Sequence, residues 1–334
     1  MKILITGGAG FIGSQLGKTL HRQGHNISLL DDMSFGHVDN LLLEGVPYGR
    51  FICQDICSDK LASALDGVEV VFHLAGIAPL PVCQADPGRA YRVNVAGVGN
   101  VLEYSRRAGV RRIIFSSTSA VYEKTKTSRF SERDAIAPDL VYACGKAAAE
   151  QLCETFSLNY GLDICIARFF NVYGPHQDIE RTSPPFTSYV ARELVCDRSP
   201  ILFNKSDAKR DYVHSEDVVR LLQLMLLDEG TFRAERFNVC SGEGYSVPEL
   251  YELFQSASGK TIPATYSDAR RYWDAYPELF EGPRPLSRDR IAEEVHKNAI
   301  GDPSATHARF GWKATTNIRD GIASVYAYAK HRLA

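Results

Sequence analysis

Several features of other protein classes are missing from this sequence of 334 residues. No apolar run approaches the ~20 residues that a membrane-spanning helix needs, so we expect no membrane partner. A net charge of −2 leaves no basic excess, which argues against nucleic acid as a partner. The 8 cysteines are scattered, without paired CxxC spacing. We therefore expect buried reduced thiols, no metal site and a cytoplasmic location.

The N-terminal stretch MKILITGGAGFIGS predicts a turn that binds phosphate. The apolar segment Lys2–Thr6 is typical of a strand, and it runs into Gly7, Gly10 and Gly13 at the start of a helical pattern. A strand that turns through glycines into a helix points the free N–H groups of the helix at one place. Because a Cβ would keep phosphates from the backbone, glycine suits a pyrophosphate there. The alternative is an ordinary glycine-rich turn.

Strands and helices alternate after this turn. Such alternation predicts an α/β fold, a Rossmann doubly wound parallel sheet with helices on both faces. The strand at 68–74 is almost entirely apolar, as expected of a strand covered on both faces. The predicted strands are 2–6, 26–30, 51–56, 68–74, 112–116 and 162–170, and the main predicted helices are 89–108, 142–160 and 216–227.

Acidic residues end the second predicted strand. Asp31 is placed to accept both hydroxyls of an adenosine ribose and would repel a 2′-phosphate, which favours NAD over NADP. Asp32 is the weaker candidate. Asp55 and Ile56 close the third strand as candidate adenine contacts. The small residues Ala75–Gly76 leave room for a flat ligand after the fourth. Together these positions predict a dinucleotide site.

The second half of the chain is more irregular. Prolines break it into loops from Asn171 onward, and residues 262–304 have little periodicity. We expect a smaller mixed α/β substrate domain over the carboxyl ends of the strands, where such sheets bind ligands. The predicted division assigns 1–170, 211–241 and 305–334 to the NAD-binding domain, and 171–210 with 242–304 to the substrate domain.

Tyr142 and Lys146 are four residues apart, hence on one face of a helix. A lysine charge close to a tyrosine lowers the pKa of the phenol, which favours a base near neutral pH. Only Tyr142 begins a helix that follows a Ser/Thr-rich strand end, so Thr118 is a candidate to hold the same substrate oxygen. The alternative is a surface helix pair. The same spacing occurs twice more, in a predicted loop and in the C-terminal helix, at Tyr122/Lys126 and Tyr326/Lys330.

A series of short motifs extends along almost the whole chain. They read TGGAGFIGS (6–14), LLDDMSFG (29–36), HLAG (73–76), NVAG (94–97), FSSTSAVY (115–122), YACGK (142–146), ARFFNVYGP (167–175), KRDYVHSEDV (209–218) and GWKAT (311–315). In the order and spacing of these motifs, the chain resembles the extended short-chain dehydrogenase/reductases. Within them it resembles the nucleotide-sugar epimerase/dehydratase group, and in particular the UDP-glucose 4-epimerases.

The resemblance implies roles at matching positions. Thr118 matches the Ser/Thr of the catalytic triad, Tyr142 its acid/base, and Lys146 the residue that binds the nicotinamide ribose. Asn171 and Arg210 match groups that hold the nucleoside diphosphate, although a surface Arg210 paired with Asp211 is an alternative. The candidate NAD contacts, from the resemblance and the strand ends together, are Gly7, Gly10, Phe11, Ile12, Asp31, Asp32, Asp55, Ile56, Leu74, Ala75, Gly76, Asn94, Ser116, Tyr142 and Lys146.

The resemblance also implies a first chemical step. Tyr142 takes the proton of the sugar 4-hydroxyl while a hydride leaves C4 for NAD. The family's dehydratases carry an Asp–Glu pair immediately after the catalytic Thr, where this chain has Ser119 and Ala120. We therefore predict an NAD-dependent nucleotide-sugar 4-epimerase, with a UDP-hexose as the favoured substrate. The alternatives are a dehydratase or decarboxylase of the family that uses Glu123, and a non-catalytic NAD-binding module.

The chain departs from the family pattern at three places that bear on the substrate. The loop before Arg210 reads FNKSDAKRDY and lacks the short glycine-containing turn that is usual there. Glu123 occupies a position where glycine is usual in the family. Its carboxylate is a candidate to contact the sugar or to serve as an additional acid/base. The alternative is a loop residue that faces solvent. Residues 282–303 are longer and more helical than the family's segment, and they contain candidates for a second diphosphate contact: Arg284, Arg288 and Arg290. The resemblance also implies a homodimer, formed through the helices near 90–108 and 142–160.

Overall fold

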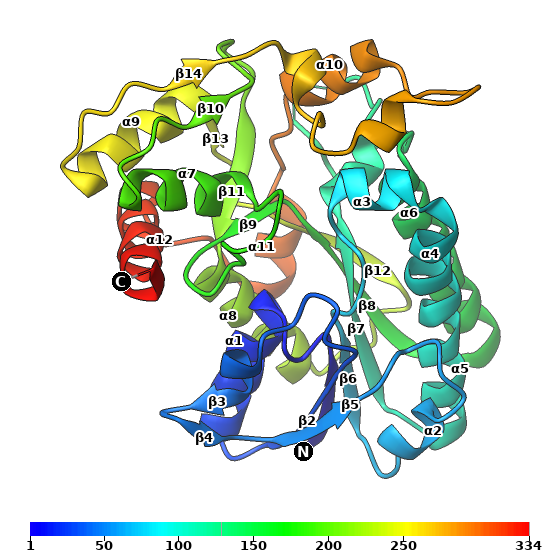
Figure 1. The fold of residues 1–334 in the computed structure, drawn as a ribbon. Helices are drawn as coiled ribbons and strands as arrows, with labels where there is room; N and C mark the ends of the chain where they lie inside the picture. Colours follow the sequence, from blue (N-terminus) through cyan, green and yellow to red (C-terminus); the bar gives the residue numbers. More distant parts are fainter. Residues whose placement is uncertain (128, 334) are drawn as a thin grey trace.

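A parallel sheet is the centre of the molecule (Figure 1). The computed structural model describes residues 1–127 and 129–333, in which seven parallel strands pair in the order β12-β8-β7-β6-β1-β2-β5. All six predicted strands are present and the Rossmann prediction is confirmed, whereas β12 was not predicted. The strands are β1 (Lys2–Thr6), β2 (Asn26–Asp31), β5 (Arg50–Cys53), β6 (Val70–His73), β7 (Arg112–Thr118), β8 (Asp163–Phe169) and β12 (Glu235–Val239).

Helices cover both faces of this sheet (Figure 1). On one face α1 (Phe11–Arg22) and α8 (Ser215–Leu227) enclose an apolar core with the strands. On the other face α5 (Val98–Ala108) and α6 (Val141–Tyr160) enclose a second one, together with the short α2 (Leu61–Ala64). A strand buried on both faces needs apolar side chains on both, which is why β6 is apolar up to its last residue, His73.

Above the carboxyl ends of the strands lies a more irregular region (Figure 1). It contains a three-stranded sheet of β13 (Gly244–Tyr245), β11 (Arg210–His214) and β9 (Asn171–Tyr173). The pair β10 (Ile201–Leu202) and β14 (Thr265–Tyr266) lies apart from it. The division into two domains at the predicted boundaries stays a prediction. The helices here are α7 (Phe186–Val195), α9 (Val247–Ser258), α10 (Arg288–His296) and α12 (Ile318–Leu333), and α11 (Ser304–Phe310) lies against α8.

The single helix predicted over 89–108 is wrong in detail. The segment consists of α4 (Pro87–Tyr91), a π-helical turn η2 (Arg92–Gly97) and α5. A π turn inserts a residue into the helix and rotates the turns after it, a change that apolar spacing alone does not reveal. The remaining short elements are β3 (Leu42–Leu43), β4 (Val46–Pro47), α3 (Leu80–Ala85) and the 3-10 turns η1 (Val38–Leu41), η3 (Ser119–Tyr122), η4 (Ala269–Arg271) and η5 (Pro277–Phe280).

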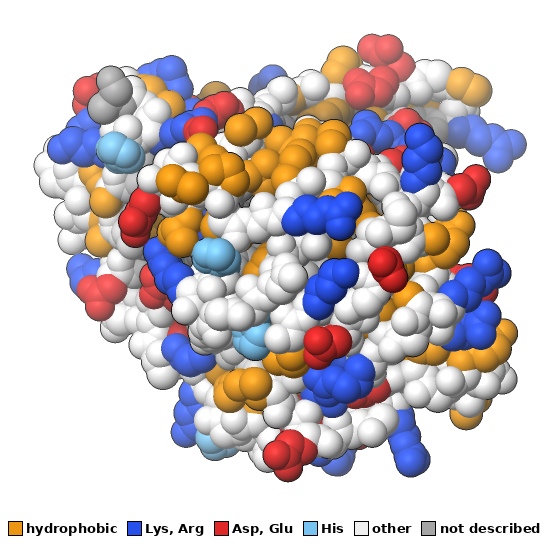
Figure 2. All heavy atoms as spheres, turned by 90° about the horizontal axis from the view of Figure 1, so that it is seen from below, with side chains coloured by type: hydrophobic (Ala, Val, Ile, Leu, Met, Phe, Trp, Pro, Cys, Tyr) orange, Lys and Arg blue, Asp and Glu red, His pale blue; other side chains and the backbone are white. Residues whose placement is uncertain are grey.

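Charged side chains of both signs share the surface, and two of the cysteines are exposed on it (Figure 2). Seen from below Figure 1, basic and acidic side chains are interspersed rather than gathered by sign (Figure 2). No helix within residues 1–127 and 129–333 is long and apolar enough to cross a membrane. All eight cysteines are free, but the expectation that all would be buried is wrong, because Cys53 and Cys196 are exposed.

Candidate active site

The glycine turn is too crowded for side chains. Gly7 has a φ of +71°, and a Cβ on it would lie 2.8 Å from the backbone nitrogen of Ala75. A Cβ on Gly13 would lie 2.2 Å from the carbonyl oxygen of Gly7. The backbone thus passes from β1 into α1, which begins at Phe11, with no side chain over the turn. This is the cradle that a pyrophosphate requires.

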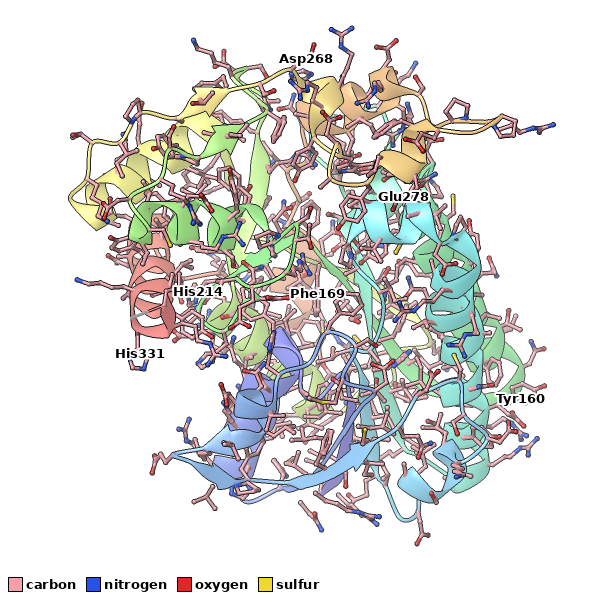
Figure 3. The ribbon with its side chains drawn as sticks, viewed as in Figure 1. Tyr160, Phe169, His214, Asp268, Glu278 and His331 are labelled. Carbon is pink, nitrogen blue, oxygen red and sulfur yellow. The ribbon has the colours of Figure 1, made fainter. Side chains whose placement is uncertain are left out.

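A cleft of about 370 Å³ opens beside this turn at the carboxyl ends of the strands. Figure 3 shows Phe169, one of its lining residues, near the centre of the molecule at the end of β8. The structure brings together the catalytic candidates and all but one of the cofactor candidates. The predicted residues that line the cleft are Gly7, Gly10, Phe11, Ile12, Asp31, Asp32, Asp55, Ile56, Leu74, Ala75, Gly76, Ser116, Thr118, Tyr142 and Lys146.

Asn94 is the cofactor candidate that does not line the cleft. Its buried side chain accepts a hydrogen bond from the backbone N–H of Ile77 and donates one to the carbonyl of the same residue, both at 2.9 Å. A Cβ on Gly76 would lie 3.0 Å from the Asn94 Oδ1. Asn94 therefore fixes the loop after β6, which in turn forms part of the cleft wall.

Asp31 is the last residue of β2 and lines one end of the cleft. Its carboxylate accepts hydrogen bonds from the backbone N–H of Ala9 at 3.0 Å and of Met33 at 2.9 Å. Burial nevertheless raises the pKa of Asp31, against the effect of those hydrogen bonds. Asp32 is exposed and lines the same end of the cleft. A site with two carboxylates at this end suits ribose hydroxyls and disfavours a 2′-phosphate.

Lys146 is buried at the wall of the cleft. Its ammonium donates a hydrogen bond of 2.7 Å to the carbonyl oxygen of Ser116 and lies 4.8 Å from the centre of the Phe115 ring. Burial lowers the pKa of Lys146 to about 8. The ammonium group therefore ties the helix α6 to the end of β7, where the catalytic candidate Thr118 stands.

The prediction that Lys146 lowers the pKa of Tyr142 is wrong for this structure. Burial is the largest effect on the Tyr142 phenol and raises its pKa to about 12, while a hydrogen bond with the Thr118 hydroxyl works in the opposite direction. The ammonium of Lys146 is directed to Ser116 instead. Tyr142 and Thr118 nevertheless meet as predicted, at the end of β7.

The two other Tyr/Lys pairs lie away from this cleft. Tyr122 belongs to η3 rather than to a loop and is fully buried. Its hydroxyl donates to Asn238 at 3.1 Å and accepts from Arg168 at 2.6 Å, so it is a structural residue. Tyr326 lies on α12. Of the three pairs, only Tyr142 and Lys146 line the cleft.

Comparison with known proteins identifies the family. Residues 3–240 match the model of the NAD dependent epimerase/dehydratase family. The chain belongs to this family. It is 30% identical to a UDP-glucose 4-epimerase of Mycolicibacterium smegmatis over 99% of each chain. Among solved structures, it is similar to the UDP-glucose 4-epimerase of Thermotoga maritima with UDP-glucose, with a TM-score of 0.86, 29% identity and 100% of each chain covered. The Thermus thermophilus UDP-glucose 4-epimerase complex with NAD gives a TM-score of 0.82 at 27% identity over 99% of each chain.

Membership in this NAD dependent family agrees with the cleft itself. The glycine turn leaves no room for side chains, the carboxylates at the end of β2 line the same cleft, and Lys146 lies where strand β7 ends. NAD is the cofactor of the enzyme. The substrate-side candidates, in contrast, lie outside the lining of this cleft, and their surroundings differ from the expectations.

Arg210 contacts a different carboxylate from the one expected. Its guanidinium lies 3.5 Å from Glu294 of α10, and it also donates to the Glu294 backbone carbonyl. Asp211 is fully buried and accepts hydrogen bonds from the backbone N–H groups of Ser241, Gly242 and Gly301. The alternative of a surface Arg210–Asp211 pair is therefore wrong. Asn171 is exposed and donates to the Asp211 carbonyl at 2.8 Å.

The arginines of residues 282–303 have separate surroundings. Arg288 contacts Asp274 at 2.6 Å, and Arg290 contacts Asp139 and Glu123. Arg284 is exposed and makes no hydrogen bond or ion pair with any residue in 1–127 and 129–333. The structure does not bring the three arginines together as one phosphate site.

The alternative of a solvent-facing Glu123 is also wrong. Its side chain is fully buried, and Oε2 accepts hydrogen bonds from the backbone N–H groups of Asp139 and Leu140, both at 2.8 Å. It is not among the residues that line the cleft. Burial raises the pKa of Glu123.

Two residues were not predicted from the sequence, Gln54 in the lining of the cleft and Arg181 outside it. Gln54 lines the cleft next to Asp55, and its side-chain nitrogen is buried without a partner among the described residues. Arg181 is half-buried, donates to the Ser183 carbonyl at 2.8 Å, and has no carboxylate within ion-pair distance in 1–127 and 129–333. Burial lowers the pKa of Arg181, against the effect of the nearby Asp178 charge. Neither residue belongs to a motif, so only the folded chain reveals them.

Proposed function

We propose that the protein is an NAD-dependent nucleotide-sugar 4-epimerase whose favoured substrate is a UDP-hexose. The observation that carries this proposal is the meeting of Thr118, Tyr142 and Lys146 at one wall of a cleft that begins at a glycine turn. The relatives named above support the substrate, since all three are UDP-glucose 4-epimerases that match nearly the full chain.

In this proposal each residue has one task. NAD, when bound, takes a hydride from C4 of the sugar and returns it to the opposite face. Tyr142 removes the proton of the 4-hydroxyl and later returns it, and the Thr118 hydroxyl holds the same oxygen. The phenol pKa of about 12 in the free protein means that Tyr142 needs further positive charge to act near neutral pH. The Lys146 ammonium and the charged nicotinamide ring are the candidates for that charge.

The nucleoside diphosphate is proposed to bind above the cleft. Arg210 and Arg181 are two half-buried guanidinium groups outside the lining of the cleft. A half-buried guanidinium without a carboxylate partner favours an anionic ligand, and the planar group binds phosphate oxygens in pairs. We propose Arg181 as a diphosphate contact beside Arg210, in place of the exposed Arg284.

Epimerisation is favoured over dehydration or decarboxylation. A dehydratase needs acid and base groups after the catalytic threonine, and Ser119 and Ala120 supply neither. Glu123, the candidate substitute, directs one oxygen to two backbone N–H groups and lies outside the cleft lining. A non-catalytic module is disfavoured because Tyr142 and Lys146 are both present and both line the cleft.

The direct experiment is incubation of the purified protein with UDP-, GDP- and dTDP-hexoses, followed by product analysis by chromatography and NMR. The proposal expects interconversion of a UDP-hexose with its C4 epimer and no net change in NAD. Accumulation of a 4-keto-6-deoxy sugar, or release of carbon dioxide, would reject it in favour of the dehydratase or decarboxylase alternative.

We further propose a cytoplasmic homodimer formed through α5 and α6. Tyr160 lies at the outer end of α6 in Figure 3 and is 57% exposed, and Leu158 on the same helix is 86% exposed. Exposed apolar side chains at the end of α6 support an interface there. Sedimentation at micromolar concentration tests this, and a monomer would contradict it.

A further inference from the structure

The start of the catalytic helix is held by a buried carboxylate. The Glu123 Oε2 accepts hydrogen bonds of 2.8 Å from the backbone N–H groups of Asp139 and Leu140, the two residues immediately before α6. Leu140 is the N-cap residue of that helix, and no side chain of its own caps the helix. Tyr142 is the second residue of α6, so the backbone that Glu123 holds is within one turn of the phenol.

The second carboxylate oxygen of Glu123 makes no such contact. Oε1 is buried and has no hydrogen-bond partner among the described residues. A buried acceptor without a partner costs free energy, on the order of 1–3 kcal/mol. The contacts that Oε2 makes, and the positive charges near it, must offset that cost if the glutamate is to remain. We therefore expect the Glu123 carboxylate to have a structural or functional role at this position.

Helix α10 completes the surroundings of Glu123. The Arg290 guanidinium lies 3.6 Å from Oε2 and also contacts Asp139. The opposite charge of Arg290 favours the ionised form of the buried carboxylate. Glu123 thus connects α10, far along the chain, with the start of the catalytic helix.

An apolar cluster holds the same two elements together. Leu140 packs with Trp273, Leu279 and Ile291, the last of which lies on α10. One turn further along α10, Glu294 contacts Arg210 at 3.5 Å and Arg290 at 3.7 Å. The start of α6 is consequently fixed from the substrate side of the molecule and not only by its own packing on the sheet.

We propose that Glu123 is a positioning residue, which fixes the start of α6 through the Asp139 and Leu140 N–H groups and so sets the place of the Tyr142 hydroxyl. This rests on the proposed function, in which Tyr142 acts on the sugar. Because the needed group is an acceptor oxygen, a glutamine at this position retains the function, whereas alanine leaves two N–H groups without their partner. An additional acid/base role would instead be lost in both variants.

The experiment compares Glu123→Ala with Glu123→Gln in the full-length holoenzyme. We expect kcat to fall about ten- to a hundred-fold in Glu123→Ala, in line with the effect of misplacing a catalytic group by about 1 Å. Glu123→Gln should stay within about threefold of the wild type, and KM should change little in both. The matched control is Glu132→Gln, because Glu132 is another glutamate whose pKa burial raises, and it accepts the backbone N–H of Asn238 at 2.6 Å rather than the N–H groups before α6.

Hydrogen exchange supplies a readout that does not depend on the proposed function. Glu123→Ala should speed amide exchange in residues 139–144 and leave 235–240 unchanged. If Glu123→Ala does not fold, Arg290→Leu should produce the same pattern with a smaller loss of kcat. An equal loss of kcat in Glu123→Ala and Glu123→Gln overturns the positioning role. Unchanged kcat and unchanged amide exchange in Glu123→Ala, or in Arg290→Leu where it replaces that variant, overturn it as well. If the wild type epimerises no nucleotide sugar while Glu123→Ala shows the exchange pattern, only the proposed function is rejected.

Discussion

The Lys146 ammonium donates a hydrogen bond to the Ser116 carbonyl at 2.7 Å and so joins the catalytic helix to the end of strand β7. Two residues later, β7 ends in Thr118, whose hydroxyl meets that of Tyr142. The three candidate catalytic side chains are thus held by one contact between a helix and a strand. Lys146 is buried where it makes this hydrogen bond, and burial lowers the pKa of its ammonium group to about 8.

The buried Lys146 predicts that stability depends on pH. Burial lowers its pKa from 10.5 to about 8, so between these pH values the unfolded chain holds a proton that the folded chain has released. The free energy of unfolding should therefore rise with pH in this window, by about 1.4 kcal/mol per pH unit for this group alone. Denaturant unfolding of the wild type and Lys146→Met measures it. The free energy of unfolding of the wild type minus that of Lys146→Met should grow with pH in this window. A value that does not grow would contradict burial of the charge.

Tyr142→Phe should remove the base and leave the rest of the cleft intact. We expect kcat to fall by about 10²–10⁴-fold, the usual contribution of an acid/base group, with bound NAD retained. Steady-state kinetics and the absorbance of released cofactor measure the two effects. Tyr326→Phe is the matched control, because Tyr326 has the same spacing to a lysine but lies on α12. Activity retained in Tyr142→Phe would disprove the assigned role.

Gly7→Ala should weaken NAD binding. Gly7 combines a φ of +71° with a Cβ position 2.8 Å from the Ala75 backbone nitrogen, so an alanine there both strains and displaces the turn. Gly24 is the control, because its φ is +82° but nothing lies within 4 Å of its Cβ position. We expect the cofactor retained after gel filtration to fall sharply in Gly7→Ala only. Equal retention in both variants would show that the turn does not approach NAD.

The ion pair between Glu150 and Arg168 predicts a large loss of stability when one partner is removed. Both side chains are 2% exposed, and the guanidinium donates to both carboxylate oxygens, at 2.6 and 2.9 Å. Arg168→Leu leaves the Glu150 charge buried with fewer partners and should cost about 3–5 kcal/mol in denaturant unfolding. Arg106→Leu, which breaks an exposed pair with Glu103, should leave the midpoint almost unchanged. Similar midpoints for both variants would contradict this ranking.

The cofactor half of the protein was largely predictable, because local signals determine it. The glycine turn of β1 and α1, and the place of Tyr142 at the start of α6, are set by residues close together in the sequence. Strand β12 was missed because its first residues, Glu235 and Arg236, suggest a loop. In the fold Arg236 is neutralised by Glu150 at 3.0 Å, a partner that no local pattern reveals.

The substrate half was less predictable for the same reason. The partner of Arg210 is Glu294, 84 residues away, and the charge beside Glu123 belongs to Arg290 on the same helix α10. Periodicity predicts which face of α10 is apolar, but not the element against which α10 packs. The raised pKa of Tyr142 was also missed, since it comes from burial by the fold and not from the spacing to Lys146.

The proposed function depends above all on the removal of a hydride from C4 and its return to the opposite face of the same sugar. This transfer is followed with UDP-glucose labelled with deuterium at C4, incubated with the purified holoenzyme and examined by NMR and mass spectrometry. We predict UDP-galactose that keeps the deuterium at C4, with no label released to water. A product without the label at C4, or one that has lost water or carbon dioxide, would contradict the proposed hydride transfer.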